Sequence, residues 1–473
     1  CVDYMLPKTT MEEFCYNELI HHCAADNERS IANGIDGLKP SQRKILHTAR
    51  QRKNGEVKVA SLAANTTDLT AYHHGEQSLV SAIMSMAQKH VGTNNIAYLK
   101  PNGQFGSRLT KRDEGLAQPR YVFTEISDIA KKMFRAEDDA VLSYAEDDGK
   151  QIEPTYFVPV ISNVLVNGCE GIGTGYKTSI PNFNPLDIID QTVSYILHAD
   201  KALEELVPYY MGFKGRVEKE GDFYIFSGLY EIKDHILTIT ELPPKVWSTH
   251  YFESLQKLTY DYIVDIDQQS TKEDVRIIVK CKSGTKLEDK NILEDFKLST
   301  KIALNQMHLF DKDNVLTRYS CTSDIIKDHA KIRLDMYQKR LQYQIRKVEL
   351  DVELYKNKAR FLKEVSDGKL KIMNKKKEEL RSELKTLHYF EHEKFNYLIT
   401  MEIFNLTLDE VDKMIKLAQK MQDELDILKN TTPQQVWLRE LDELKTEYQT
   451  YMYKCLNPDV KLKEKKQRTS KKN

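Results

Sequence analysis

Four short segments of this chain carry residue types that suit chemistry on a phosphodiester. They are residues 36–44, 71–76, 119–124 and 170–175. The third contains Tyr121 directly after Arg120. A phenol has a pKa of about 10 and is a weak nucleophile at neutral pH, whereas nearby positive charge stabilises the phenolate and lowers that pKa. Together the segments predict a nucleophilic tyrosine in a basic pocket, beside a glycine-rich turn.

Basic side chains in these segments are suited to the phosphate itself. Phosphoryl transfer builds negative charge on the non-bridging oxygens, which cationic groups neutralise. Arg43 can bind a phosphate through two parallel hydrogen bonds, and His73 and His74 can move a proton or donate to the phosphate. Alone, an Arg–Tyr pair is more often a packing feature and a His–His pair more often structural. Only the four segments together favour catalysis.

Composition narrows the class of protein. A chain of 473 residues is too long for one core, so about three domains are expected. Charged residues make up 30% but the net charge is −1, so DNA binding would depend on local patches. Seven scattered cysteines without a C-x-x-C pair predict reduced thiols in an intracellular protein and no zinc site.

The ends and the apolar runs add two expectations. No apolar run is long enough to cross a membrane and no signal peptide opens the chain, so no membrane partner is expected. The chain begins with Cys1 rather than methionine, which predicts a fragment or a processed product.

Changes in residue composition and apolar spacing along the chain predict an α+β multidomain fold. Residues 1–160 are expected to form a winged-helix module of helix-turn-helix type with an N-terminal lead-in, and residues 161–318 an α/β domain. Periodic apolar positions predict helices at 12–25, 41–50, 77–90 and 247–258. Residues rich in β-branched and aromatic side chains predict strands at 224–226, 235–240 and 274–280.

Residues 319–456 predict a long antiparallel coiled coil with a helical head. Apolar residues alternate in steps of four and three from Leu341 to Leu362, and again from Trp437 to Tyr451, so these two segments are expected to pair. A dimerisation head is expected between them, although an intramolecular hairpin without a partner stays open. Its apolar residues are Phe395, Tyr397, Leu398, Ile403, Phe404, Leu406 and Leu408.

The last segment, residues 457–473, is basic and poor in apolar side chains, which predicts a disordered tail. Contact with DNA, a nuclear targeting signal and a solubilising role all remain open for it.

The chain resembles the breakage–reunion region of the type IIA DNA topoisomerases, in the branch of eukaryotes and large DNA viruses. The shared strings follow the family's order through nearly the whole chain. They lie at 29–31, 36–44, 72–76, 103–108, 119–121, 152–154, 170–175, 212–215, 241–243 and 307–311. The paired histidines and the string at 307–311 favour this branch over bacterial gyrase.

The resemblance implies that the winged-helix module of residues 1–160 is the DNA-cleavage domain and that residues 161–318 form the α/β tower domain. It also implies a role for each matching residue. Tyr121 matches the nucleophile that becomes linked to a DNA 5′ end, with Arg120 beside it. Arg43, His73 and His74 match residues that contact the scissile phosphate and the neighbouring backbone.

Ile172 matches an apolar wedge that enters a base step and bends the DNA. Flanking glycines allow a close approach, and an inserted aliphatic side chain unstacks the step. Without the resemblance, a buried isoleucine would be the ordinary interpretation. The remaining matches are supporting DNA contacts by Gln42, Lys44, Gln104 and Arg108.

The resemblance also implies the reaction and its requirements. It implies an ATP-dependent isomerase that breaks both strands of a duplex, passes a second duplex and reseals the break, which changes supercoiling and decatenates DNA. The implied partners are double-stranded DNA and a second copy of the chain, joined through a C-gate and a DNA gate. The implied location is intracellular: the nucleus, or the host cytoplasm or virion for a viral protein.

Two departures from the family matter. Mg²⁺ and ATP are expected in the full-length enzyme, but this chain has neither the ATP-binding region nor the acidic metal-binding set, so no metal ligands are expected in it. Alone, it should bind and bend DNA but cleave poorly. Residues 110–118 are more charged than the family pattern, which leaves local DNA contacts open.

Two other classes remain possible. A site-specific tyrosine recombinase or nickase also forms a phosphotyrosine, but it does not explain the stalk or the glycine-rich turn. A non-catalytic DNA-binding coiled-coil dimer of chromosome-organising type needs neither the Arg120–Tyr121 pair nor the paired histidines.

Overall fold

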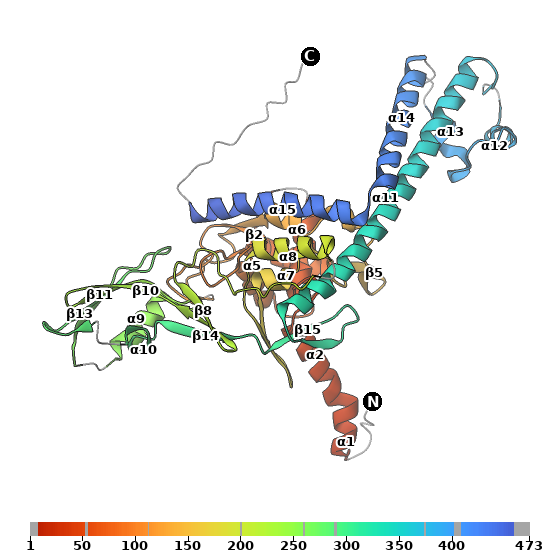
Figure 1. Cartoon of the computed structure of the whole chain (residues 1–473). Helices are drawn as coiled ribbons and strands as arrows, with labels where there is room; N and C mark the ends of the chain where they lie inside the picture. The colour runs from red at the N-terminus through yellow and green to blue at the C-terminus, as the bar shows by residue number, and fades with distance from the viewer. Residues whose placement is uncertain are drawn as a thin grey trace. The chain divides into compact units, whose positions relative to one another are not determined.

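The computed structural model describes residues 8–52, 55–111, 113–198, 201–258, 261–287, 291–372, 375–401 and 408–457. The chain divides into two compact units. Unit 1 consists of Cys1–Arg333 with Leu438–Asn473, and unit 2 is Leu334–Trp437. Helix α11 (Thr322–Ser366) begins in unit 1 and continues into unit 2, whereas α15 (Pro433–Leu456) begins in unit 2 and continues into unit 1 (Figure 1).

The first described elements of unit 1 form a helical stretch. It comprises α1 (Met11–Phe14), the π-helical η1 (Cys15–Leu19) and α2 (Ile20–Ser30). A capping box fixes its first turn: the Thr10 hydroxyl accepts a bond from the Glu13 amide, and the Glu13 carboxylate accepts one from the Thr10 amide. The helix predicted at 12–25 is therefore present and longer at both ends.

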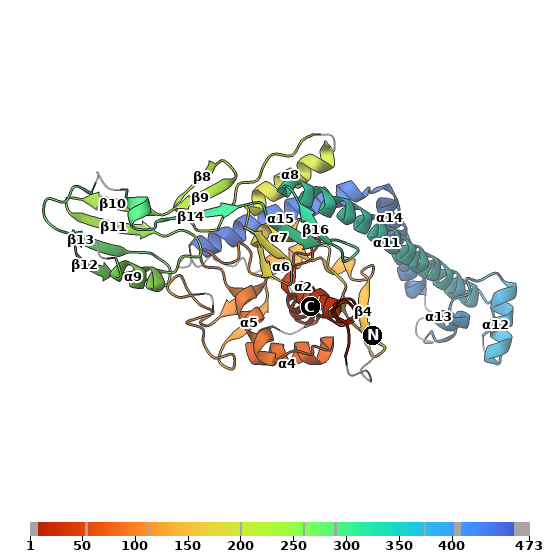
Figure 2. The same ribbon diagram turned by 90° about the horizontal axis from the view of Figure 1, so that it is seen from below.

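Three helices and a small sheet follow, as a winged-helix module requires. The helices are α3 (Pro40–Gln51), α4 (Val59–Thr70) and α5 (Glu76–Ala87), and the antiparallel sheet has the order β1 (Val57–Lys58), β3 (Phe123–Ile126), β2 (Leu99–Asn102). Figure 2 shows α4 and α5 side by side. Pro40 stands at the first position of α3, where its fixed φ favours the helix and no N–H is needed.

Two-stranded hairpins and short helices surround this module. The hairpins pair β4 (Tyr144–Asp147) with β5 (Lys150–Pro154), β6 (Cys169–Ile172) with β7 (Lys177–Ile180), and β15 (Met307–Phe310) with β16 (Leu316–Tyr319). The helices are α6 (Asp128–Met133), the 3₁₀ turn η2 (Ala136–Asp138), α7 (Asn163–Asn167) and α8 (Pro185–Leu197).

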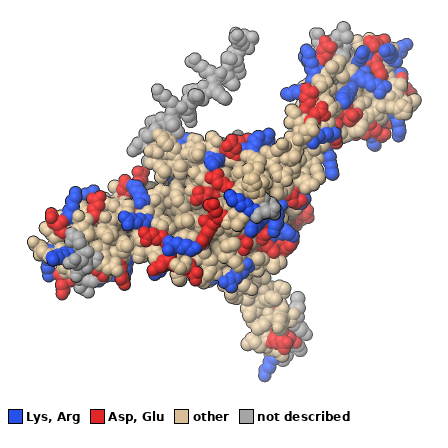
Figure 3. All heavy atoms as spheres, viewed as in Figure 1, with Lys and Arg blue, Asp and Glu red and all other residues tan. Residues whose placement is uncertain are grey.

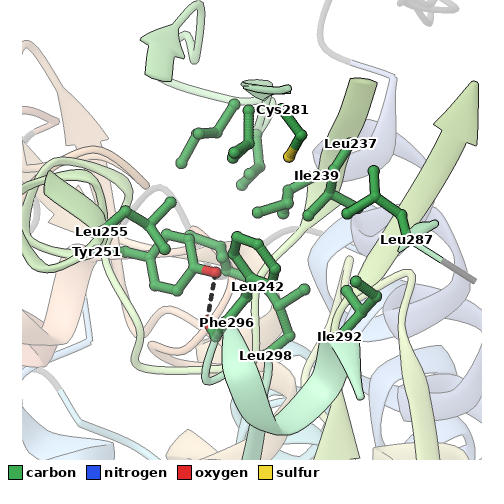
Figure 4. Packing of buried hydrophobic residues seen from close by; sticks show 13 residues of the cluster. Leu237, Ile239, Leu242, Tyr251, Leu255, Cys281, Leu287, Ile292, Phe296 and Leu298 are labelled. Carbon is green, nitrogen blue, oxygen red and sulfur yellow. Dashed lines mark hydrogen bonds between the residues drawn. The ribbon is translucent and has the colours of Figure 1, made fainter. Parts of the chain in front are cut away.

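The predicted tower consists of two antiparallel sheets. One has the order β10 (Leu229–Lys233), β11 (Ile236–Glu241), β13 (Ile277–Cys281), β12 (Ile263–Gln268), and the other β14 (Ser299–Ala303), β9 (Phe223–Ser227), β8 (Arg216–Glu220). Helices α9 (Ser248–Gln256) and α10 (Ile292–Asp295) supply further core residues. Figure 4 shows this core, in which the buried Tyr251 hydroxyl donates to the Phe296 carbonyl oxygen at 2.6 Å.

Unit 2 is an antiparallel helical stalk with a small head. Val348 and Val352 of α11 pack against Leu425 of α14 (Leu408–Asn430). Lys356 and Lys429 bond across the pair, to Gln422 and Glu349 respectively, so residue numbers fall along α14 as they rise along α11. The predicted coiled coil is present, but the predicted pairing was wrong for the 341–362 segment, which packs against α14. The start of α15 does contact α11, N-terminal to that segment: the rings of Trp437 and Tyr337 lie 5.9 Å apart.

The head of unit 2 has its own core. It includes α12 (Lys377–Thr386), the 3₁₀ turn η4 (Glu393–Phe395) and α13 (Asn396–Ile399). Phe395 and Leu398 are buried against Phe361 and Leu384 of the same chain. The expectation that these two residues need a partner chain was therefore wrong. Ile403, Phe404, Leu406 and the side chain of Leu408 lie outside the described residues, as do residues 458–473 of the predicted tail.

The part of α15 in unit 1 is a structural brace rather than a stalk helix. Glu443 pairs with Lys132 at 2.9 Å and with Arg135 at 3.0 Å, and the Ala97 amide donates to the Tyr451 hydroxyl at 3.0 Å. Leu441, Leu444 and Tyr448 are fully buried. The heptad spacing thus correctly predicted a helix with one buried face. It did not predict which surface covers that face.

Candidate active site and DNA interface

Tyr121 lies in a turn that is attached to the first turn of α4. The Tyr121 amide donates to the Gln118 carbonyl at 2.9 Å. The amides of Val59 and Ala60 donate to the carbonyls of Val122 and Pro119 at 3.1 and 3.3 Å. The first amides of a helix have no partner within the helix, so these bonds satisfy them while holding the turn. The backbone of the tyrosine is fixed on both sides.

The side chain of Tyr121 is free to react. The residue is 67% exposed, which is unusual for an aromatic residue next to the buried Val122. The Arg120 guanidinium carbon lies 4.9 Å from the centre of the phenol ring, within the range of a cation–π contact. Arg120 is itself exposed, so its donors can reach a phosphate placed at the phenol oxygen.

His73 and His74 lie at the other end of α4. They follow the helix end at Ala71, which adopts the left-handed conformation, and precede α5. His73 is exposed with Nε2 3.8 Å from an Asp147 carboxylate oxygen, and the exposed His74 ring packs edge-on against Tyr72. Since α4 has 12 residues, the histidines and Tyr121 are about 18 Å apart along its axis. One chain does not bring them together.

Lys44 and Arg43, both on α3, are engaged by protein groups. The Lys44 ammonium donates to the Thr70 carbonyl at 2.6 Å and pairs with Glu153 at 2.8 Å. The buried Arg43 forms a two-pronged pair with Asp36, from Nε at 2.6 Å and from Nη2 at 3.1 Å. Arg43 makes the fork geometry expected for a phosphate, but its partner is a carboxylate of the same motif.

Arg108 is a structural residue, which corrects its predicted DNA contact. It is 1% exposed, and its guanidinium bonds Glu241 at 2.9 Å and the carbonyls of Leu242 and Val91 at 2.6 and 3.1 Å. A guanidinium enclosed in this way cannot touch a duplex. It instead joins the 91–108 segment to the end of β11.

Ile172 ends β6, at the tip of the β6–β7 hairpin, and is 76% exposed. The Gly173 amide donates to the Tyr176 carbonyl at 2.9 Å, which closes the turn. The flanking glycines are needed because a Cβ on Gly171 would overlap the Ser30 carbonyl, and one on Gly173 would overlap the Asn27 side chain. The expectation of an ordinary buried isoleucine does not hold.

The two predicted glutamines lie in different places. Gln42 accepts a bond from the Lys39 amide at 2.9 Å and lines a cavity of about 270 Å³ near the hairpin, with Glu170 and Lys245. Gln104 accepts a bond from the Lys272 ammonium at 3.1 Å. Both amides remain partly exposed.

In the part of the chain that the structure describes, neither a cluster of charges nor a set of metal ligands marks a further binding site. Figure 3 shows basic and acidic side chains interspersed over the face drawn. Within the described ranges, no three or more His, Cys, Asp or Glu side chains are arranged to hold a metal ion. In the same part of the chain, no helix is both long and apolar enough to cross a membrane.

Comparison with known proteins decides the family. The family model for the A-type subunit of DNA gyrase/topoisomerase IV matches residues 29–442. The chain belongs to this family. It is 35% identical to DNA topoisomerase 2 of Arabidopsis thaliana over 94% of this chain and 34% of the relative. It is 36% identical to DNA topoisomerase 2 of Plasmodium falciparum over 94% of this chain and 35% of the relative.

A solved structure of another topoisomerase has the same fold as this chain. The Plasmodium falciparum topoisomerase II DNA-binding, cleavage and re-ligation domain superposes with a TM-score of 0.86 at 36% identity, over 96% of this chain and 66% of that one. The predicted α+β fold class and the resemblance to the eukaryotic branch are confirmed. The chain spans about a third of the length of these curated relatives.

Proposed function

We propose that this chain is the DNA-gate part of an ATP-dependent type II DNA topoisomerase. It binds a duplex, bends it, and takes part in a transient double-strand break that lets a second duplex pass before religation. The observation that carries the proposal is the exposed Tyr121, whose backbone is held by the first turn of α4 and whose ring lies 4.9 Å from the Arg120 guanidinium carbon. A non-catalytic DNA-binding protein needs no such exposed nucleophile.

The cleavage step conserves the phosphodiester energy. The phenol oxygen of Tyr121 attacks a backbone phosphorus, the bond from phosphorus to the 3′ oxygen breaks, and a proton passes to the leaving 3′ hydroxyl. The product is a 5′-phosphotyrosine, and attack by the same 3′ hydroxyl reverses the step. Arg120 stabilises the charge that develops on the non-bridging oxygens. No oxidant or other co-reactant is required.

The other predicted contacts are assigned to the flanking DNA. Because His73 and His74 are about 18 Å from Tyr121 along α4, we assign them to backbone phosphates farther along the duplex. Ile172 is assigned as the wedge that unstacks a base step. Gln42 and Gln104 are partly exposed and can donate to the backbone, whereas Lys44 and the buried Arg43 reach it only if their carboxylate partners give way.

Mg²⁺ and ATP belong to the proposed full-length enzyme. The acidic residues of the described segments do not form a metal site. In this family Mg²⁺ would supply charge neutralisation at the phosphate, and ATP would time the gates. We place the ligands of both outside the residues described.

We further propose a two-fold dimer that acts where cellular DNA is kept. Cleavage of both strands needs two tyrosines, and an isologous pair of chains supplies them with the required symmetry. Light scattering that gives the mass of one chain, both with and without DNA, would contradict the dimer.

An intracellular location, and the nucleus in particular, follows from the DNA substrate. One relative is named as mitochondrial.

Replacing Tyr121 by Phe tests the function. In a protein that carries the metal- and ATP-binding parts, Tyr121→Phe should abolish covalent DNA linkage, because only the attacking oxygen is removed. Duplex affinity should stay unchanged, which is the control for folding. Covalent protein–DNA complexes trapped by detergent from the Phe variant would show that another residue is the nucleophile.

A further inference from the structure

The face of the β6–β7 hairpin that carries Ile172 also carries Lys177. In an antiparallel pair, residues directly opposite one another lie on the same face, and neighbours along a strand alternate. Ile172 is opposite Lys177, and Glu170 is two residues before Ile172. Glu170, Ile172 and Lys177 therefore share one face, which is called the wedge face below.

The opposite face of the hairpin rests on α2. Gly171 and Gly173 approach Ser30 and Asn27 so closely that a side chain would not fit. Gly171 is opposite the buried Thr178. The alternation therefore places the wedge face away from α2, which explains why Ile172 is among the most exposed apolar residues of the chain.

Three lysines lie at or next to this part of the hairpin, and one of them pairs with the Glu170 carboxylate. Lys39 donates from its ammonium to the Glu170 carbonyl at 2.8 Å, and Lys245 pairs with the Glu170 carboxylate. Lys177 is exposed, and its ammonium has no ion-pair or hydrogen-bond partner in the described part of the chain. These three lysines outnumber the one carboxylate beside them, and Lys177 is the lysine that no protein group of the described residues engages.

The hairpin backbone around Lys177 is held in place by hydrogen bonds to neighbouring elements. The Asn27 amide donates to the Thr174 carbonyl at 3.1 Å, and a His308 ring nitrogen lies 2.9 Å from the Lys177 carbonyl oxygen. The Ser179 amide donates to the Gln306 carbonyl at 2.8 Å. The turn and β7 are therefore fixed to neighbouring elements before any DNA arrives, so little backbone entropy is lost on binding.

We propose that Lys177 binds a backbone phosphate beside the base step that Ile172 opens, and so stabilises the bent duplex. This rests on the proposed function. Opening a step costs a few kcal/mol and is favourable only when the bend brings protein charge to the backbone. Cβ atoms of directly opposite residues are about 5 Å apart, so a flexible ammonium can reach the backbone next to the inserted side chain.

Salt-dependent binding to a short duplex tests the assignment. Each phosphate neutralised contributes about −0.9 to the slope of log K against log salt concentration. The slope of Lys177→Gln should be shallower by about that amount for each chain bound, and Lys177→Arg should restore it. Lys347→Gln is the matched control, because it removes one charge from an exposed lysine of α11 in unit 2 and should leave the slope unchanged.

The result separates this inference from the proposed function. If the unmodified chain showed no salt-dependent duplex binding, the proposed function itself would fail. If it bound normally and Lys177→Gln kept the full slope, only the role of Lys177 would be overturned.

A double-mutant cycle tests the link to the wedge. If Lys177 binds a phosphate exposed by the kink, the loss in slope caused by Lys177→Gln should shrink when Ile172 is already Ala. Energy transfer across an end-labelled duplex should show a smaller bend for each single variant. Independent, additive effects would mean that Lys177 binds straight DNA, which contradicts the proposal.

Discussion

The buried arginines of unit 1 and its exposed site residues all lie in strings shared with the family, but they have opposite surroundings. Arg43 and Arg108 are enclosed and paired with Asp36 and Glu241. Arg120 and Tyr121 are exposed, and their contact is with each other. The shared strings thus contain two kinds of residue, those that hold the fold and those that are exposed and available to a substrate.

Physical chemistry requires this division. A buried guanidinium is tolerated only with a carboxylate and carbonyl groups around it, which is what Arg43 and Arg108 have. A nucleophile must be reached by its target and needs charge nearby that the protein has not already neutralised. Burial therefore separates the two roles where residue type alone does not.

The largest expected effect is on stability when a buried arginine is removed. Arg108→Ala should destabilise unit 1 by roughly 3–5 kcal/mol, because it leaves the Glu241 carboxylate buried and unpaired. Arg120→Ala is the matched control and should change stability by less than about 0.5 kcal/mol while impairing DNA cleavage. Urea-induced unfolding of both variants measures the two losses of stability. Equal losses would contradict the division between buried structural arginines and exposed site residues.

A slightly smaller effect is expected in the stalk of unit 2. Leu425→Ala should cost roughly 2–5 kcal/mol, because Leu425 packs against Val348 and Val352. Hydrogen exchange should become faster in the amides of α14 and in the facing part of α11, with α15 unchanged. Faster exchange in residues 438–456 instead would support the pairing that the heptad spacing had predicted.

The smallest effect on stability is expected at the wedge. Ile172→Ala should change the free energy of unfolding by less than about 0.5 kcal/mol, because the side chain is 76% exposed. The same variant should bend DNA less, since the apolar group that unstacks a base step has been shortened. An unchanged bend, measured by energy transfer on a labelled duplex, would remove Ile172 from the interface.

Much of this arrangement could be predicted from the sequence, and the exceptions have physical causes. The glycine-rich turn at 170–175 follows from a local motif, since a turn with close glycines is specified within a few residues, whereas the roles of Tyr121 and Ile172 were implied by the resemblance. The role of Arg108 could not be predicted, because its partner Glu241 lies 133 positions away in the chain. Asp36 lies only seven residues before Arg43, so that ion pair could have been proposed from the sequence.

Helix α4, which separates Tyr121 from the paired histidines, was not predicted. Its buried stripe is Val59, Leu62, Ala63, Thr66 and Thr70, and two polar residues interrupt the apolar period. Thr66 and Thr70 donate from their hydroxyls to carbonyls four residues earlier, at 2.8 and 2.6 Å. A threonine satisfied within its own helix can be buried, so a purely apolar pattern understates such a helix.

Heptad spacing likewise identifies a stripe but not its partner. The 341–362 and 437–451 segments both have buried apolar faces. The first is covered by α14, whereas the second contacts α11 through Trp437 and, from Leu441 onward, is buried in unit 1. Side-chain spacing reports that a helix face is buried. It does not carry information on which distant surface meets that face.

The most direct test of the central claim is to identify the residue that carries DNA. Covalent complexes trapped with a labelled duplex can be digested with nuclease and protease, and the nucleotide-bearing peptide sequenced by mass spectrometry. The account predicts one modified residue, Tyr121, joined to a 5′ phosphate. A nucleotide on any other residue, or a link to a 3′ phosphate, would contradict it.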